Sequence, residues 1–263
     1  MNHHSLYDVG LLRIPVLEQA MAWLVENGPL VAHPNLPAWT LKALVKDRRI
    51  VRLRRGLYLV PDRDGHLPSL EATIQHVAPT GYITGWAALA HHGLTDQDPG
   101  RWAVVTPERN AGFAYGRATV DFHTSPSRAA GADIVIASEG RHGPGVTRWA
   151  TAKQAFIDLL DRPELGPDAG SVAGSLRTGI EGGVVGFADL VSAVTGHGAV
   201  ASARRLGFLG EIASNSRLPG LLPLAHRSHN WSRLGTSETV ARDSRWRLLL
   251  PLPVDVIRAR AAQ

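Results

Sequence analysis

The chain has 263 residues, of which 44% are hydrophobic, so it can form one large or two modest folded domains, and we predict two. Its 28 lysines and arginines exceed its 23 aspartates and glutamates by five, which favours an acidic partner. The absence of cysteine excludes disulfides, thiol nucleophiles and cysteine-ligated metals. No apolar run approaches the roughly 18 to 20 residues of a membrane span, and the first 15 residues lack a signal-peptide pattern. We therefore predict a cytoplasmic protein without a membrane partner.

The amino-terminal part of the chain predicts a helix and a tight connector. Pro15 is expected to begin an amphipathic helix, and Asn27-Gly28-Pro29 to end it. The following segment, 30–37, is short and contains two prolines, so we expect little more than one helical turn there. Such a connector is what a helix-turn-helix requires.

A second helical pattern follows and runs into a hairpin. The apolar residues of 41–45 fall at i, i+3 and i+4, so they share one face that can pack on a small core, while Trp39 lies on the opposite face. Over 50–60 the apolar period changes to two, which predicts two short strands. Gly56 is expected to supply the positive φ of the turn between them.

We call residues 42–55 the basic segment. It contains seven cations and one acidic residue, Asp47. Arginine suits a phosphate backbone or a guanine edge because its planar guanidinium can form two hydrogen bonds at once. The alternative for such a charge run is an ordinary solvated face. The order of helix, turn and basic hairpin favours a winged helix-turn-helix that binds DNA. The predicted DNA-binding residues are Lys42, Lys46, Arg48, Arg49, Arg52, Arg54 and Arg55.

The polar segment 61–68, with two prolines and a glycine, has the composition of a linker. We therefore predict a winged helix-turn-helix domain over 1–66 and a larger mixed α+β domain over 67–263. In the second domain, Ser69 is expected to cap a helix, and 81–93 to form a short buried helix with Thr84 as its N-cap and Gly93 as its C-terminal glycine.

The remaining elements alternate between strand and helix patterns. Short spacing between the strands favours an antiparallel or mixed sheet. We expect strands at 102–106, 118–122, 134–137, 146–150 and 244–250, and helices at 151–161, 171–178, 187–194 and 199–214.

No familiar catalytic pattern occurs in the chain. It contains no GxxxxGK[ST] phosphate loop, no HExxH and no GxSxG. His91 and His92 lie about 100° apart around a helix, so they cannot ligate one metal from the same face. No carboxylate or third histidine lies at a metal-ligand spacing from His226 and His229, so we expect a solvated loop there. We predict no catalytic residue, no metal and no cofactor, and we leave open a metal-dependent nuclease, because the scattered aspartates neither indicate nor exclude one.

Several segments together resemble the AbiEi family of antitoxins and transcriptional regulators from abortive-infection toxin-antitoxin systems. The resemblance covers most of the chain, and its most specific part is GYITGWAALAHHGLTDQ. The similar segments are 48–61, 81–97, 151–163, 204–213 and 243–248.

The resemblance implies an amino-terminal winged helix that binds inverted repeats in the promoter of its own operon. It also implies a carboxy-terminal domain that counteracts a nucleotidyltransferase-like toxin, with direct contact between the two proteins left open. Symmetric half-sites would suit a dimer or two cooperating monomers. No antitoxin active-site residue can be carried over, and Asp158 is expected to be structural. The alternative function is a protein-interaction module whose basic face docks an acidic toxin or another acidic partner.

Overall fold

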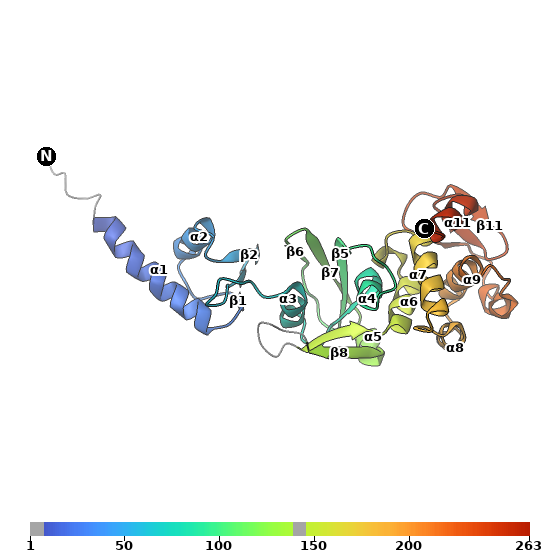
Figure 1. The fold of residues 1–263 in the computed structure, drawn as a ribbon, viewed down its shortest axis with the longest axis horizontal. Helices are drawn as coiled ribbons and strands as arrows, with labels where there is room; N and C mark the ends of the chain where they lie inside the picture. Colours follow the sequence, from blue (N-terminus) through green and yellow to red (C-terminus); the bar gives the residue numbers. More distant parts are fainter. Residues whose placement is uncertain (1–7, 139–145) are drawn as a thin grey trace. The chain divides into compact units, whose positions relative to one another are not determined.

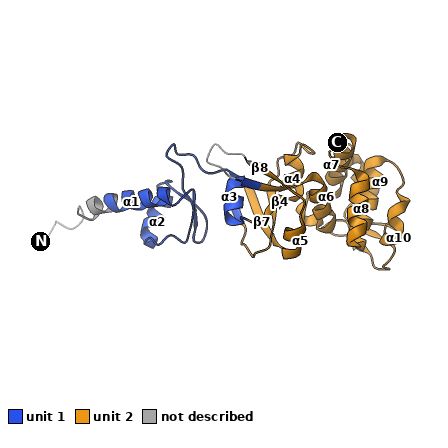
Figure 2. Ribbon diagram, turned by 90° about the horizontal axis from the view of Figure 1, so that it is seen from below, with its two compact units in different colours: residues 1–79, 113–116, 138–147 blue, residues 80–112, 117–137, 148–263 orange. Residues whose placement is uncertain are grey.

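The computed structural model describes residues 8–138 and 146–263, and it has the predicted mixed α+β architecture (Figure 1). The chain divides into two compact units, which Figure 2 colours blue and orange. Unit 1 comprises residues 1–79, 113–116 and 138–147, and unit 2 comprises residues 80–112, 117–137 and 148–263. The domain boundary between residues 66 and 67 stays a prediction. In the described part of the chain, no helix has the length and apolar character needed to cross a membrane.

Unit 1 contains helices and a small sheet. Its elements are α1 (Asp8–Glu26), β1 (Leu30–Ala32), α2 (Ala38–Lys46), β2 (Val51–Arg54), β3 (Leu57–Leu59), α3 (Leu70–Val77) and β6 (Phe113–Tyr115). The prediction that the first helix begins at Pro15 was wrong, because α1 begins at Asp8 and contains the proline. Proline removes one backbone hydrogen bond from a helix, but it does not always end the helix. Segment 30–37 was expected to hold a helical turn, and instead it begins with β1.

The sheet of unit 1 has the order β1-β3-β2 and is antiparallel throughout. One face contributes Val31 and Tyr58 to a core shared with α1 and α2, whose buried members include Leu24 and Leu44. The opposite face packs in a second cluster, made of Leu30, Leu57 and Leu59 with Leu53, Leu67, Val77 and Tyr115. Strand β3 is therefore buried on both faces, and it anchors the hairpin that it forms with β2.

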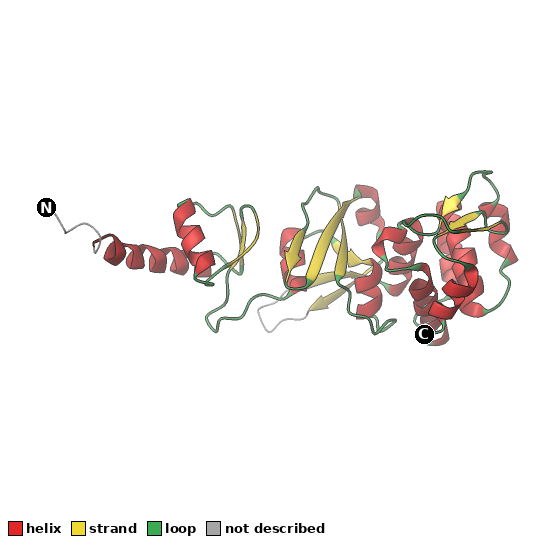
Figure 3. Ribbon diagram, turned by 90° about the horizontal axis from the view of Figure 1, so that it is seen from above, coloured by secondary structure: helices red, strands yellow, loops and turns green. Residues whose placement is uncertain are grey.

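Unit 2 combines a mixed sheet with a group of helices (Figure 3). Within unit 2 the larger sheet has the order β7-β5-β4-β9-β8, in which β4 and β5 are antiparallel while β4–β9 and β5–β7 are parallel. This confirms the mixed pairing. A smaller sheet has the order β10-β12-β11.

The bounds of these elements agree with most of the predicted ranges. The strands of the larger sheet are β4 (Tyr82–Thr84), β5 (Arg101–Thr106), β7 (Ala118–Thr124), β8 (Ile134–Ser138) and β9 (Val146–Ala150), and those of the smaller sheet are β10 (Ser232–Arg233), β11 (Ala241–Asp243) and β12 (Leu248–Leu250). The helices are α4 (Gly85–His91), α5 (Pro126–Gly131), α6 (Ala152–Asp161), η1 (Pro163–Leu165), α7 (Ala169–Glu181), α8 (Phe187–His197), α9 (Val200–Ser214), η2 (Pro219–Leu221), α10 (Leu222–Ala225) and α11 (Val254–Ala261). The strand expected over 244–250 is shorter than predicted, because Arg247 has a φ of 50° and only 248–250 pair as β12.

Segment 81–97 forms β4 and α4, and most of it is packing surface. The side chains of Ile83, Trp86 and Leu89 are buried, and Gly93 has the positive φ expected of a C-terminal glycine. Thr84 is the N-cap residue of α4, as predicted, but its side chain makes no capping hydrogen bond. Its hydroxyl donates a hydrogen bond to Asp158 instead, at 2.7 Å.

Asp158, on α6, is the buried acceptor around which this packing is arranged. Its side chain has no exposed surface, and its Oδ2 accepts hydrogen bonds from the hydroxyls of Tyr82, at 3.0 Å, and Thr84. Its Oδ1 accepts from the amide of Gln154, at 3.0 Å, and from the guanidinium of Arg128, at 2.7 Å. Strand β4 and helices α5 and α6 are thus joined by one carboxylate. Burial, followed by the charge of Asp158, raises the pKa of the Tyr82 hydroxyl far above its ordinary value, so it stays a donor.

Helix α9 and the turn before β12 meet through a second buried network. Gly207 lies against the ring of Trp246 so closely that an added Cβ would fall 2.2 Å from it. The indole Nε1 of Trp246 donates to Glu211, at 3.0 Å, and Arg245 pairs with the same carboxylate. Segments 204–213 and 243–248 are therefore two halves of one packed interface.

We predict that replacing Asp158 by Asn will destabilise unit 2 strongly. The substitution removes one of the two carboxylates that pair with Arg128, the other being Asp161, and puts an amide NH2 where a buried oxygen now accepts hydrogen bonds. Removal of one partner of a buried ion pair costs about 3 to 5 kcal/mol. Urea denaturation followed by circular dichroism measures this loss. Asp98→Asn, at an exposed position, is the matched control and should change stability by less than about 0.5 kcal/mol. Equal stability of the two variants would contradict the assignment.

We also predict that Glu211 makes stability pH-dependent. Burial raises the pKa of its carboxyl, but hydrogen bonds from Leu218, Trp246 and Arg245 outweigh burial and lower it below its ordinary value of 4.5. A carboxyl with a depressed folded pKa stabilises the protein fully above its unfolded pKa, and this contribution is lost as the pH falls through the folded value. Denaturation midpoints measured between about pH 6 and pH 3 should therefore decline less steeply for Glu211→Gln than for the unmodified chain. Parallel declines would refute this.

Candidate nucleic-acid interface

Helix α2 turns its apolar side inward and its cations outward. Leu41 and Leu44 are buried, as the spacing predicted, whereas Lys42 and Lys46 are exposed. The two lysines are four residues apart, so they lie one turn apart on the same face of the helix. No acidic residue occurs in α2 to neutralise them. The outer face of this helix is therefore uniformly positive.

The turn that ends α2 places Arg48 in an unusual backbone conformation. The N–H of Arg48 donates to the carbonyl of Val45, at 3.1 Å, and the N–H of Arg49 donates to the carbonyl of Leu44, at 2.9 Å. This pair of bonds defines a Schellman motif, whose left-handed position is most often glycine. Arg48 occupies that position with a φ of 57°, and its side chain is exposed. Glycine adopts this left-handed backbone conformation more readily, so an arginine at position 48 lowers the stability of the folded turn relative to glycine.

Arg49 differs from the other cations because it has an internal partner. Its guanidinium donates two hydrogen bonds to the carboxylate of Glu18 on α1, with lengths of 2.7 and 3.0 Å. The hydrogen bond from Arg49 lowers the pKa of Glu18. The pair connects α1 to the turn after α2, so Arg49 holds the basic segment in place in addition to contributing charge.

The β2–β3 hairpin presents the remaining arginines. Val51 pairs with Leu59, Arg52 with Tyr58 and Arg54 with Leu57, with a register shift between Arg52 and Arg54. The guanidinium Nε of Arg52 lies 3.4 Å from the carbonyl oxygen of Arg54, at the long limit of a hydrogen bond. The side chain of Arg55 is exposed at the hairpin turn.

Gly56 shapes this turn in two ways. It has the predicted positive φ, here 75°. Its open side also lies under the imidazole of His33, so that an added Cβ would come within 2.5 Å of the ring, and its carbonyl accepts the His33 N–H. The hairpin turn therefore depends on His33, a residue before α2, and the sequence of the hairpin alone does not indicate this contact.

The structure thus gathers the seven predicted cations on α2, its terminal turn and the adjacent hairpin, and Lys42, Lys46, Arg48, Arg52 and Arg55 are exposed there. Arg49 forms a salt bridge with Glu18. Two large apolar side chains lie among them with much of their surface exposed, Trp39 at 44% and Val51 at 40%. The sequence placed Trp39 on the helix face opposite the core, whereas the exposure of Val51 was not evident from it, because this exposure depends on which face of β2 meets the core.

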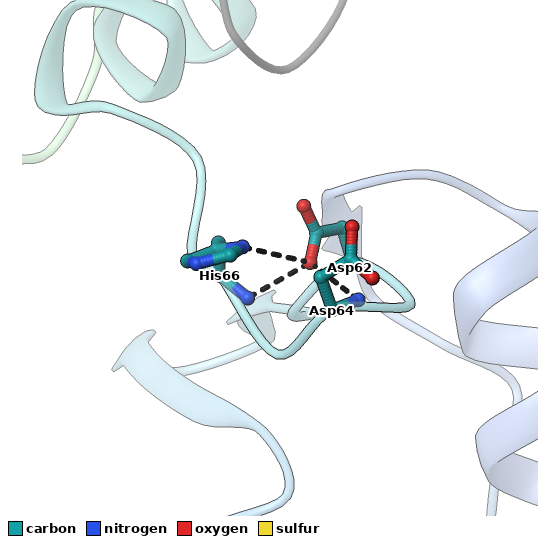
Figure 4. Close-up of side chains that lie close together, drawn as sticks. All are labelled: Asp62, Asp64 and His66. Atoms are coloured by element: carbon teal, nitrogen blue, oxygen red, sulfur yellow. Dashed lines mark hydrogen bonds and ion pairs between the residues drawn. The ribbon is translucent and has the colours of Figure 1, made fainter.

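The linker segment contains the one group of possible metal ligands within the described residues. Asp62, Asp64 and His66 are all exposed, and their ligand atoms lie within 4.8 Å of one another (Figure 4). One oxygen of Asp62, however, already accepts the backbone N–H groups of Asp64, at 2.9 Å, and His66, at 2.8 Å. These bonds describe a carboxylate that stabilises a turn, and they give no separate indication of a metal.

The other histidines singled out by sequence have structural contacts. His91 stacks on Trp149 with the ring centroids 4.1 Å apart, and a ring nitrogen of His92 lies 2.7 Å from the carbonyl oxygen of Ala150. His226 contacts the carbonyl of Arg245, at 2.8 Å, and His229 is exposed.

Comparison with known proteins establishes the fold more than the activity. No protein-family model matches the sequence, and no curated protein matches it. Among solved structures, the chain is similar to the crystal structure of RV2827C protein from Mycobacterium tuberculosis, with a TM-score of 0.57 and 14% sequence identity. The match covers 93% of this chain and 94% of that chain. At this identity it shows a shared α+β fold over nearly the whole length.

We predict that Gly56→Ala will destabilise unit 1 more than Gly65→Ala. Both positions have positive φ, 75° and 84°, so both substitutions incur the cost of about 1 kcal/mol for a left-handed alanine. Only at Gly56 does the new methyl group also meet a neighbour, the His33 ring, whereas Gly65 has open space. Thermal denaturation of the two variants measures the difference. Adding His33→Ala to Gly56→Ala should recover the excess, and a failure to recover it would show that the close approach is not what limits this turn.

Proposed function

We propose that α1, β1, α2 and the β2–β3 hairpin form a winged helix-turn-helix that binds duplex DNA. In this proposal α2 is the recognition helix and the hairpin is the wing. The observation that carries it is the concentration of exposed lysines and arginines on one helix face, its terminal turn and a neighbouring hairpin. Such a surface can replace the counterions of a phosphate backbone, which supply most of non-specific DNA affinity.

The geometry suggests different roles for the two parts of the surface. Lys42 and Lys46 on α2 would reach phosphates or base edges in the major groove, and Trp39 beside them could contact a thymine methyl group. The hairpin arginines would fix the register through the backbone or enter the adjacent minor groove. Arg49, which is engaged with Glu18, would act mainly by positioning the turn between α2 and β2.

The biological role that we propose is a cytoplasmic antitoxin and transcriptional autorepressor. The resemblance of 48–61 and 81–97 to the AbiEi family supports this role, because that family joins a DNA-binding winged helix to a larger domain. Unit 2 would then counteract a nucleotidyltransferase-like toxin, and the DNA partner would be inverted repeats in the promoter of the operon. The alternative is a protein-interaction module whose basic face docks an acidic partner.

The test is gel-shift titration of the full chain on the DNA immediately upstream of its gene, at several salt concentrations. We expect log K to fall with log salt at a slope of about −0.9 for each phosphate neutralised. Lys46→Ala and Arg55→Ala should each weaken binding and reduce the slope by roughly one. Arg48→Gly should do the same without loss of stability, because glycine suits the left-handed position.

Arg258→Ala provides the matched control, since it removes an exposed arginine from α11 in unit 2. It should leave both affinity and slope unchanged. If the basic-segment variants behave like this control on operator DNA, the winged-helix proposal is wrong. Copurification of a stoichiometric acidic partner that is lost in those same variants would then favour the interaction module.

A further inference from the structure

The small sheet of unit 2 presents an outer face that none of the preceding functions uses. Arg233 on β10 and Arg242 on β11 are both in register with Leu249 on the central strand β12. Residues in register across a sheet point to the same side, and alternation sends Leu248 and Leu250 to the buried side. The outer face therefore carries two exposed arginines flanking a half-buried leucine.

An exposed tryptophan extends this face. Trp231 directly precedes β10 and exposes 41% of its surface, and the guanidinium carbon of Arg242 lies 5.7 Å from the centroid of its ring. Such a distance is that of a cation–π contact. Val240, just before β11, is 64% exposed. The exposed indole and valine, together with the neighbouring Arg242, form a small patch that combines apolar surface with positive charge.

The charge on this face is not neutralised locally. Segment 226–247 contains five arginines but only two acidic residues, Glu238 and Asp243. Asp243 accepts the backbone N–H of Trp246, at 2.7 Å, and so is engaged in the turn before β12. Within the described residues, neither Arg233 nor Arg242 forms an ion pair with a carboxylate. The face is complementary to an anionic partner.

The loop that carries Trp231 is held rigidly from below. Arg204, which is almost completely buried on α9, donates hydrogen bonds to the carbonyls of Ala225, at 2.8 Å, and Ser228, at 2.6 Å, and also to the carbonyl of Asn230. Asn230 is the residue before the tryptophan. Because the buried guanidinium binds one carbonyl at the end of α10 and two in this loop, the backbone that carries Trp231 has little conformational freedom to lose on binding.

We propose that the outer face of β10, β11 and β12 binds single-stranded nucleic acid. An unpaired base would stack on the exposed part of Trp231, while Arg233 and Arg242 contact the adjoining phosphates. Stacking on an aromatic side chain beside basic residues is the usual means of binding single strands without sequence preference. Duplex DNA fits less well, because its base faces are covered by their neighbours in the stack. This site is separate from the basic segment and extends beyond the proposed DNA-binding function.

Fluorescence anisotropy of the full chain with labelled 12-nucleotide oligothymidylate and oligouridylate tests the proposal and separates DNA from RNA. Trp231→Ala should weaken binding of at least one probe by about 5- to 100-fold, the range for loss of one stacked base. Trp231→Phe should retain most of the affinity, because it preserves a ring. Replacing Arg233 and Arg242 together by Ala should reduce the salt slope by about 1.4, since single strands contribute roughly 0.7 per phosphate.

Two control variants test whether any loss of oligonucleotide binding is specific to the outer face of β10, β11 and β12. Trp23→Ala removes another exposed tryptophan, on α1, and Arg258→Ala removes another exposed arginine, and both should bind like the unmodified chain. Thermal melting confirms that each variant is folded. Failure of both probes to bind, equal loss in Trp231→Ala and Trp23→Ala, or loss in the arginine variant alone would overturn the stacking site. Duplex operator binding, which the basic segment governs, should stay within about two-fold in Trp231→Ala, so the two proposals fail independently.

Discussion

The buried carboxylate of Asp158 is the interaction on which the packing of unit 2 depends. It accepts from two hydroxyls of β4, from Gln154 on its own helix and from Arg128 on α5, so elements distant in sequence share one acceptor. A buried charge is tolerated only when it is paired and hydrogen-bonded, which is why these donors are required together. Segment 81–97 therefore has a structural explanation, because its side chains belong to this packing.

Charge has two different uses in this chain, and burial separates them. Arg128 and Arg204 bind groups inside the protein. Arg128 pairs with the buried carboxylate of Asp158, and Arg204 donates hydrogen bonds to backbone carbonyls that would otherwise lack partners. In the basic segment, by contrast, apolar residues build the core and leave the cations at the surface, where Arg49 and Glu18 fix the local geometry. The outer face of the small sheet follows the same arrangement, because a buried arginine rigidifies the loop that displays Trp231. The net charge of the sequence could not show which cations bind buried groups and which are exposed to solvent.

The sequence predicted elements with strong local signals and missed those that depend on distant partners. Ser69 caps its helix as expected, and the strands from 102 to 150 lie close to their predicted ranges. Segment 30–37 was misread because β1 exists only through its pairing with β3. Thr84 occupies the predicted N-cap position, but its hydroxyl is oriented toward the buried carboxylate of Asp158, a partner 74 residues away in the chain that the local sequence does not indicate.

Composition, periodicity and charge spacing by themselves determined the α+β class, the amphipathic face of α2, the positive φ of Gly56 and the candidate cations between Lys42 and Arg55. These depend on residues close together in the chain, where helix and strand periods are readable. Tertiary structure alone decided that Arg49 is engaged while Lys42, Lys46, Arg48 and Arg55 are not, that Gly56 must admit the His33 ring, and that Trp231 joins Arg242 on one face. The physical reason is the same in each case: which side chains are displayed depends on contacts between residues that only the folded chain brings together.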